Sequence, residues 1–157
     1  MAVFIKDEDI LTRQNGTKLL LFRNFSCKDG QYKSAYPNFN VVVTESMANK
    51  LMDEGFSVRT YEDRDGNTMY RLKVNVRFDN FPPKVYKVLG RKKLRLDQET
   101  ISDLDRDEIV KLDMTVSRSS GGATYLSTGY FTIDEDEIDR LYDFDDEDED
   151  DYEPPFK

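Results

Sequence analysis

One segment of the sequence, residues 69–78, constrains the fold more than any other. Its apolar residues alternate strictly with basic and amide side chains: Leu72, Val74, Val76 and Phe78 are interleaved with Arg71, Lys73, Asn75 and Arg77. Successive side chains of a β-strand point to opposite faces of the sheet. The alternation therefore predicts a strand with one face in the core and one solvated, cationic face.

Similar runs divide most of the chain into short strands joined by polar turns. They cover residues 18–25, 39–44, 56–61, 84–89, 109–116 and 124–133. Asp65-Gly66 is typical of a tight turn, so the runs on either side of it are predicted to pair as a hairpin. Helices are predicted over residues 46–54, 97–104 and 134–142. About six strands with short helices between them predict a mainly β fold, a small barrel or sandwich of five to six strands with helical inserts.

The composition excludes several kinds of functional site. The 157 residues contain no His and a single Cys, Cys27. A Cys/His zinc site, a Ser-His or Cys-His catalytic pair and a disulfide within the chain are therefore ruled out. The sequence also contains no apolar run of 18 residues, and its first ten residues carry acids. These features predict a soluble, cytoplasmic protein without a cofactor.

The aspartates at positions 103, 105 and 107 imitate the first ligands of a calcium loop. The loop fails at its sixth position, where Glu108 replaces the required glycine, and at its twelfth, where Met114 replaces a bidentate glutamate. We expect no metal site here, because solvated acids after a short helix account for the pattern.

The net charge of −9 averages two very different parts of the chain. Residues 134–157 hold 14 acids and two basic residues, whereas residues 1–133 hold 21 basic and 18 acidic residues. The body therefore carries about +3 and the C-terminal part −12. A mildly basic body is compatible with an anionic partner.

The segment from residue 143 to residue 157 is predicted to be a disordered acidic tail on a domain formed by residues 1–142. Nine carboxylates lie between Asp143 and Glu153, and such a block repels itself and cannot bury enough apolar surface to fold. Phe144, Tyr152 and Phe156 interrupt the acids. The aromatic residues favour a docking peptide for partner proteins over a tail that only confers solubility.

Basic residues interleaved with aromatic ones form three clusters in the body. The candidates for contact with nucleic acid are Arg23, Phe25, Lys28, Lys33, Tyr36, Arg59, Tyr61, Arg71, Lys73, Arg77, Tyr86, Lys87, Arg91, Lys92 and Lys93. Cations bind backbone phosphates, and unpaired bases stack on aromatic rings, which predicts a single-stranded ligand. Taken singly, Arg and Lys on a solvated strand face most often serve only solubility, and Phe25 is as compatible with the core as with stacking.

Five phrases of the sequence resemble bacteriophage single-stranded DNA-binding proteins of the OB-fold type. They are NFS at 24–26, YPNFNVVV at 36–43, PPKVY at 82–86, LDQETISDLD at 96–105 and SGGATYLSTGYFTID at 120–134. The resemblance implies an OB barrel, binding of DNA intermediates in replication, recombination or repair in the host cytoplasm, and an acidic tail that contacts partner proteins. The chain departs from the pattern at Cys27, where a glycine is expected after NFS. It also ends in Lys157, so recognition of a terminal Phe carboxylate is not carried over.

Three functions remain at this point. The favoured one is a non-enzymatic protein that coats single-stranded DNA with little sequence preference, while its tail competes for the groove. An acidic-tailed adaptor or chaperone without nucleic-acid binding is the alternative, and a carboxylate-dependent metal nuclease is a distant third. The oligomeric state is open, a homodimer included.

Overall fold

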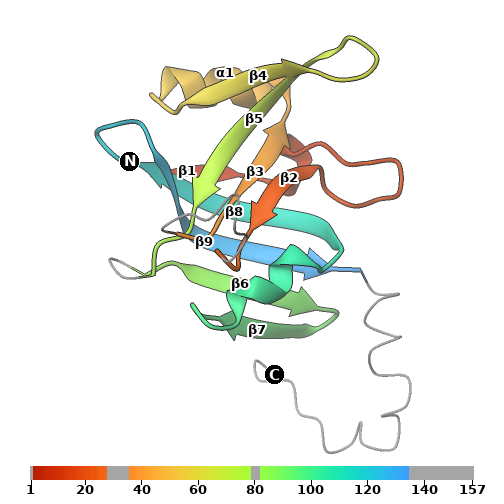
Figure 1. Cartoon of the computed structure of the whole chain (residues 1–157), viewed down its shortest axis with the longest axis vertical. Helices are drawn as coiled ribbons and strands as arrows, with labels where there is room; N and C mark the ends of the chain where they lie inside the picture. The colour runs from red at the N-terminus through yellow and green to blue at the C-terminus, as the bar shows by residue number, and fades with distance from the viewer. Residues whose placement is uncertain (1, 28–35, 79–81, 135–157) are drawn as a thin grey trace, which may run out of the picture.

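The computed structural model describes residues 2–27, 36–78 and 82–134. Within these ranges the chain forms nine strands, one α-helix and two 3-10 helices. In chain order they are β1 (Ala2–Ile5), η1 (Asp7–Asp9), β2 (Leu20–Asn24), β3 (Asn38–Val43), α1 (Glu45–Asp53), β4 (Val58–Glu62), β5 (Thr68–Asn75), β6 (Lys84–Leu89), β7 (Lys92–Leu96), η2 (Ile101–Asp105), β8 (Ile109–Arg118) and β9 (Thr124–Ile133). Figure 1 shows β3 and β5 running across the direction of β8 and β9, with α1 and β4 at one end and the β6–β7 hairpin at the other.

Strand β9 joins the two parts of this mixed sheet. One edge of β9 pairs antiparallel with β8 along most of its length. The other edge of β9 pairs with two strands that run parallel to it: β5, through Asn75 and Tyr125, and β6. Beyond β8 lies β1, and beyond β5 lie β3 and then β2. Strand β4 also pairs with β5, and β7 pairs with β6. The pairings of the described residues leave the sheet open.

The inward side chains of the strands meet in one core. Phe25, Phe39 and Phe131 lie at its centre, with ring centroids 5.1 to 5.9 Å apart. Stacked and edge-to-face pairs at this spacing add to the free energy gained by burying the rings. Phe25 directly follows β2, Phe39 belongs to β3 and Phe131 belongs to β9. Contacts among the three rings therefore connect the two parts of the sheet.

Helix α1 begins and ends where the sequence predicts a helix, within one residue. The Thr44 hydroxyl accepts a hydrogen bond from the amide of Met47 at 3.2 Å, which satisfies a free donor of the first turn. Gly55 follows the helix with φ 91°, a backbone conformation that favours glycine. Met47, Ala48 and Leu51 are buried, so the helix covers the core with one face and presents Lys50 to solvent.

The structure confirms the mainly β fold and the β4–β5 hairpin. The sheet has nine strands, however, where the sequence predicts five or six, and the OB type stays a prediction. The helix predicted over residues 97–104 is only the 3-10 helix η2, whose N-cap is Thr100, without a side-chain capping bond. Asp97 orders the turn before it, because its Oδ1 accepts from the amides of Glu99 and Thr100 at 2.9 and 3.0 Å. The acidic tail lies outside the described residues. So does the helix predicted over residues 134–142, except for its first residue.

Strands β1 and β7 are absent from the sequence-based prediction because each carries too short a pattern. Strand β1 has four residues and gains its order by pairing with residues 114–117 of β8. Strand β7 is dominated by Lys and Arg, but Leu94 and Leu96 do alternate in it. Gly90, with φ 64°, occupies the first central position of the two-residue turn from β6 to β7, where glycine is favoured.

Candidate nucleic-acid interface

The outward faces of β4 and β5 form one continuous surface, which borders β3, a strand whose six residues are all buried. Lys73 lies opposite Asn40 of β3, and Arg71 lies opposite Arg59 of β4. Residues opposite each other in an antiparallel pair point to the same face. Leu72, Val74 and their neighbours of the same parity are buried on the other side. We call this outward surface, with the adjoining Phe22 of β2 and with Asn40, which is 3% exposed and accepts a hydrogen bond from Arg71, the sheet face; its residues are Phe22, Asn40, Arg59, Tyr61, Arg71 and Lys73.

Phe22 is the most unusual residue of the sheet face. The register of β2 with β3 shifts between Leu21 and Asn24, and Phe22 adopts φ 52° within this irregularity. A bulge re-aims side chains, and Phe22 is consequently 70% exposed although Leu20, of the same parity, is buried. An L-residue in the left-handed region costs about 1–2 kcal/mol. Strain of this kind occurs preferentially at functional sites.

Arg71 connects the aromatic and polar parts of the sheet face. Its guanidinium carbon lies 5.6 Å from the centroid of the Phe22 ring, and its Nη1 donates to Asn40 Oδ1 at 2.8 Å. These contacts hold the guanidinium over the exposed ring, so a cation and an aromatic face are presented together. Sequence reasoning missed Phe22, because strict alternation through residues 20–24 would bury it.

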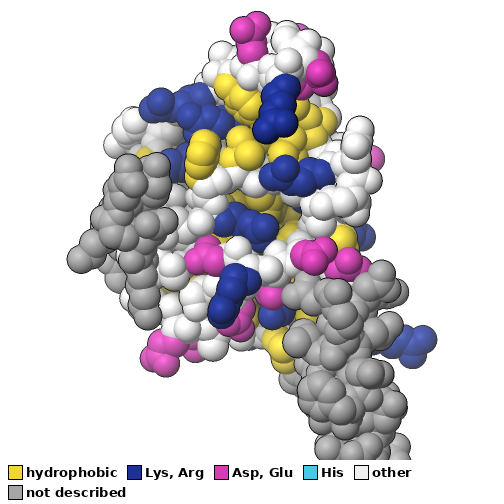
Figure 2. All heavy atoms as spheres, turned by 45° about the vertical axis from the view of Figure 1, so that its right-hand side comes forward, with side chains coloured by type: hydrophobic (Ala, Val, Ile, Leu, Met, Phe, Trp, Pro, Cys, Tyr) yellow, Lys and Arg dark blue, Asp and Glu magenta, His cyan; other side chains and the backbone are white. Residues whose placement is uncertain are grey.

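The positive charge of the sheet face is not neutralised locally. Among the described residues, Arg59, Arg71 and Lys73 form no ion pair. Arg59 and Arg71 are directly opposite each other, and like charges in that position destabilise a sheet. A bound anion would remove this repulsion. The space-filling view in Figure 2 shows dark blue Lys and Arg side chains set around a yellow apolar surface.

Tyr61 is a neutral, partly exposed ring on this surface. Burial, followed by the nearby Asp63 carboxylate, raises the pKa of its phenol above the ordinary value of 10.0, while Arg13 and Arg71 act in the opposite direction. The phenol is therefore protonated at neutral pH.

A second aromatic and cationic group, here named the Tyr86–Tyr130 cluster, lies on the outward faces of β6, β7 and β9. The two rings stack with centroids 5.0 Å apart and an interplanar angle of 11°. Lys93 Nζ lies 4.9 Å from the Tyr86 centroid and 5.5 Å from that of Tyr130, and the Arg95 guanidinium carbon lies 5.6 Å from Tyr86. Tyr130 was not a sequence candidate, although it alternates with the buried Phe131.

The structure places the other candidates in different environments. The Arg77 guanidinium lies over Tyr36, 5.1 Å from the ring centroid. Arg91 is exposed in the β6–β7 turn, and Lys92 is half-buried at the start of β7. Lys28 and Lys33 lie outside the described residues, as do Phe144, Tyr152 and Phe156 of the tail.

Two candidates, Phe25 and Lys87, are corrected because their side chains are engaged inside the protein, and a third, Arg23, lies off the sheet face. Phe25 is 1% exposed in the aromatic core, so a base cannot reach its ring. Lys87 Nζ forms an ion pair with Asp107 Oδ2 at 2.8 Å, and its side chain is only 12% exposed. Arg23 is half-buried and donates from Nη1 to the carbonyls of Leu104 and Asp107 at 3.0 and 2.6 Å. None of the three belongs to the sheet face.

Other site types find no support in residues 2–27, 36–78 and 82–134. No group of three or more His, Cys, Asp or Glu side chains in these ranges could hold a metal ion. No helix within them is long and apolar enough to cross a membrane.

Comparison with known proteins agrees with the chemistry of these surfaces. No curated protein and no solved structure matches the chain. One family model does match, described as "Putative phage ssDNA-binding domain", and the match extends over residues 3–153. It spans nearly the whole chain, including all the strands except the first residue of β1. The chain therefore belongs to this family of phage single-stranded DNA-binding domains.

Proposed function

We propose that the sheet face binds single-stranded DNA with little sequence preference. The observation that carries this proposal is the combination of unpaired cations with open aromatic rings on one surface: Arg59, Arg71 and Lys73 beside Phe22 and Tyr61. The cations can follow the phosphates of a strand while the rings stack its bases. Every base has an aromatic face, so stacking discriminates weakly among sequences. Paired bases are stacked on each other, so duplex DNA should bind less tightly.

The sheet face is a better primary site than the Tyr86–Tyr130 cluster. Lys93 already lies over both rings of the cluster, and a base would have to displace its ammonium group. Phe22 also has a cation, Arg71, over its ring, but the residue is 70% exposed, whereas Tyr130 is 36% exposed. We assign to the cluster, with Arg91 and Lys92 beside it, a secondary contact to phosphates of a longer strand.

The role that follows is non-enzymatic. The protein would coat single-stranded intermediates of phage DNA replication and recombination, protecting them and presenting them to other proteins. The family description supports the binding of single-stranded DNA by phage proteins and goes no further.

The acidic segment from residue 143 to 157 would have two roles in this proposal. Its nine carboxylates can imitate a phosphate chain and compete for the cationic surface when no DNA is bound. Its aromatic residues Phe144, Tyr152 and Phe156 would anchor it to partner proteins. Tethering keeps the acids at high effective concentration near the body.

The test is a titration of the full chain with fluorescein-labelled oligo-dT and with a duplex of the same length, followed by anisotropy. Oligo-dT should bind more tightly. The double variant Arg59→Gln/Lys73→Gln should reduce the slope of log K against log salt by about 1.4, because each phosphate on a single strand contributes about 0.7. Lys50→Gln on the solvent side of α1 removes a charge away from the face and serves as the control.

Three outcomes would contradict the proposal. Equal affinity for duplex and single-stranded DNA would show that the exposed rings do not stack unpaired bases. A slope unchanged in the double variant would remove the sheet face from the interface. No binding to any oligonucleotide would favour the adaptor instead.

A further inference from the structure

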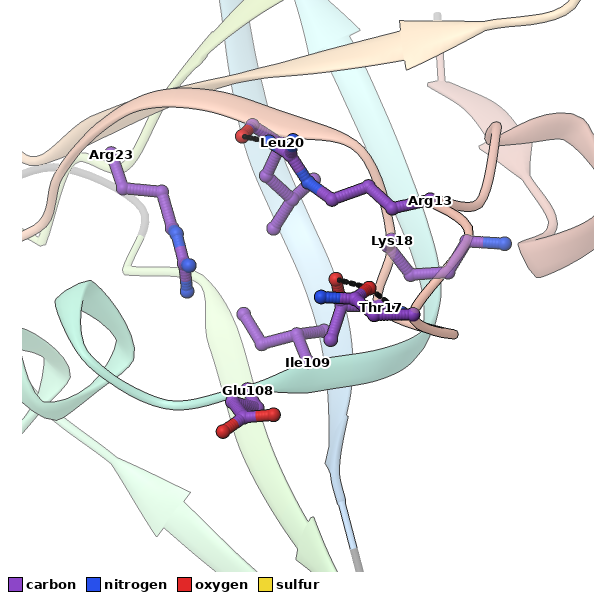
Figure 3. Close-up of a pocket in the computed structure, with 8 residues that line it drawn as sticks. Arg13, Thr17, Lys18, Leu20, Arg23, Glu108 and Ile109 are labelled. Carbon is purple, nitrogen blue, oxygen red and sulfur yellow. Dashed lines mark hydrogen bonds between the residues drawn. The ribbon is translucent and has the colours of Figure 1, made fainter.

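A pocket of about 360 Å³ lies at the edge strand β2, and one of the sequence candidates, Arg23, is part of its lining. Its walls come from the 13–17 turn, from Leu20 and Arg23 of β2, and from Glu108 and Ile109 at the start of β8. Figure 3 shows Arg13, Arg23 and Glu108 around this space, contributed by three separate parts of the chain. The pocket thus brings together two guanidinium groups that are ten residues apart in the sequence.

Backbone hydrogen bonds fix the walls. The Arg13 amide donates to the Thr17 carbonyl at 2.7 Å, and the Gly16 amide donates back to the Arg13 carbonyl at 2.9 Å. Asn15 Oδ1 accepts from the Thr17 amide and hydroxyl at 3.0 and 2.7 Å. The Lys18 amide donates to the Ile109 carbonyl at 2.8 Å, which ties the turn to β8. A site built on such a turn is already ordered before a ligand arrives.

Lys18 lines the pocket only with its stem. Its ammonium group forms an ion pair with Asp7 at 3.2 Å and donates to Thr12 Oγ1 at 2.8 Å. Figure 3 shows that this group is turned away from Arg23. The positive charge available to a ligand therefore comes from Arg13 and Arg23.

Both guanidinium groups keep donors in reserve. Arg13 Nη2 donates to the Leu20 carbonyl at 3.1 Å, and Arg23 is bonded through Nη1 alone among the described residues. A guanidinium has five N–H donors, so each group can still bind an anion. Burial lowers the pKa of Arg23, the Asp105 carboxylate opposes this, and the charge of Arg13 lowers it again. The two cations thus repel each other across the pocket, and an anion between them would relieve the repulsion.

The position of the pocket indicates where such an anion would come from. Arg13 acts electrostatically on Tyr61, and Leu21 of β2 lies opposite Asn40 of the sheet face. A strand lying across the sheet face would therefore reach the pocket as it passes the edge strand β2. The planar fork of arginine matches the oxygens of a phosphate.

We propose that this pocket binds one internal phosphodiester of the single strand, held between Arg13 and Arg23. The inference rests on the proposed function of the sheet face. Glu108 is the one acidic side chain among the lining residues, and it opposes the bound charge.

The experiment measures binding of labelled oligo-dT, with and without a 5′-phosphate, by the full-length protein. Arg13→Gln should weaken binding about five- to ten-fold and reduce the salt slope by about 0.7. Arg13→Lys should keep the slope but recover only part of the affinity, because it retains the charge without the fork. Glu108→Gln should tighten binding about three-fold. Lys50→Gln is the charge control, and melting temperatures verify that each variant is folded.

The outcomes separate this inference from the proposed function. If the wild-type protein does not bind oligo-dT, the proposed function fails. If it binds but Arg13→Gln behaves like Lys50→Gln, the sheet face stands and the pocket assignment is wrong. If Arg13→Gln weakens only the 5′-phosphorylated oligonucleotide, the ligand is a terminal phosphate and the internal phosphodiester is refuted. Weaker binding by Glu108→Gln would show that its carboxylate accepts a hydrogen bond from the strand, which also contradicts the proposal.

Discussion

Replacing Phe22 with alanine removes the main stacking surface proposed for DNA while disturbing the fold little. The residue is 70% exposed, so less than a third of it is buried. Full burial of a phenylalanine side chain contributes about 1.5–3 kcal/mol, and the exposed contact with Arg71 about 0.5–1 kcal/mol. The free energy of unfolding should therefore fall by less than about 2 kcal/mol. One base–aromatic stack is worth about 1–3 kcal/mol, so affinity for oligo-dT should fall roughly 5- to 150-fold.

The assay combines anisotropy with oligo-dT and urea denaturation of the same preparations. The matched control is Phe4→Ala, which removes a ring 50% exposed on β1, away from the sheet face. Phe4→Ala should leave DNA affinity unchanged. If both substitutions reduce affinity equally, or if Phe22→Ala reduces stability without affecting affinity, Phe22 is not a stacking residue.

Four further predictions concern the backbone, a buried ion pair, a turn and the tail. Cys27 has φ 58°, a conformation that glycine adopts without strain, so Cys27→Gly should raise the free energy of unfolding by about 0.5–1 kcal/mol. This value is the strain relieved minus the conformational entropy that glycine adds to the unfolded chain. A lower free energy of unfolding in urea denaturation would contradict this prediction. Lys87→Met breaks the ion pair with the buried Asp107 carboxylate, so it should lower the free energy of unfolding by up to about 3–5 kcal/mol, yet preserve DNA affinity where the protein stays folded; a selective loss of affinity would return Lys87 to the interface. The amide of Asn67 chiefly lowers the pKa of Asp63, which should lie below 3.8 in an NMR titration. The ionised carboxylate therefore contributes to stability above pH 3.8, and this contribution is lost as the pH falls through the lowered pKa. A pKa at or above 3.8 would contradict the hydrogen bonds of the turn. Deleting residues 143–157 should tighten DNA binding, most at low salt; unchanged affinity there would leave the segment without a competitive role.

Regular alternation predicted much of the sheet. The runs at residues 56–61 and 69–78 became the β4–β5 hairpin, and the alternation of the second run correctly placed Arg71 on the face opposite the buried Leu72. Parity depends only on the period of the strand, so it holds wherever the ladder is regular.

The sequence could not show where the ladder is irregular. The bulge in β2 turns Phe22 outward, and Phe25 after it enters the core, the reverse of what a surface cluster predicts. Lys87 is a different case: it lies between the buried Val85 and Leu89, so parity already pointed it inward and only the local excess of cations suggested a DNA contact. The missing glycine at Cys27 did mark an unusual backbone, because that residue has a positive φ.

The central claim, that single-stranded DNA lies on the sheet face, is tested most directly by NMR. Oligo-dT is titrated into the ¹⁵N-labelled protein, and the shifts of backbone and Asn side-chain amides are mapped onto the structure. The account predicts the largest changes at Phe22, Asn40, Tyr61 and Arg71, with α1 unaffected. Changes confined to the Tyr86–Tyr130 cluster, or spread evenly over the surface, would contradict it.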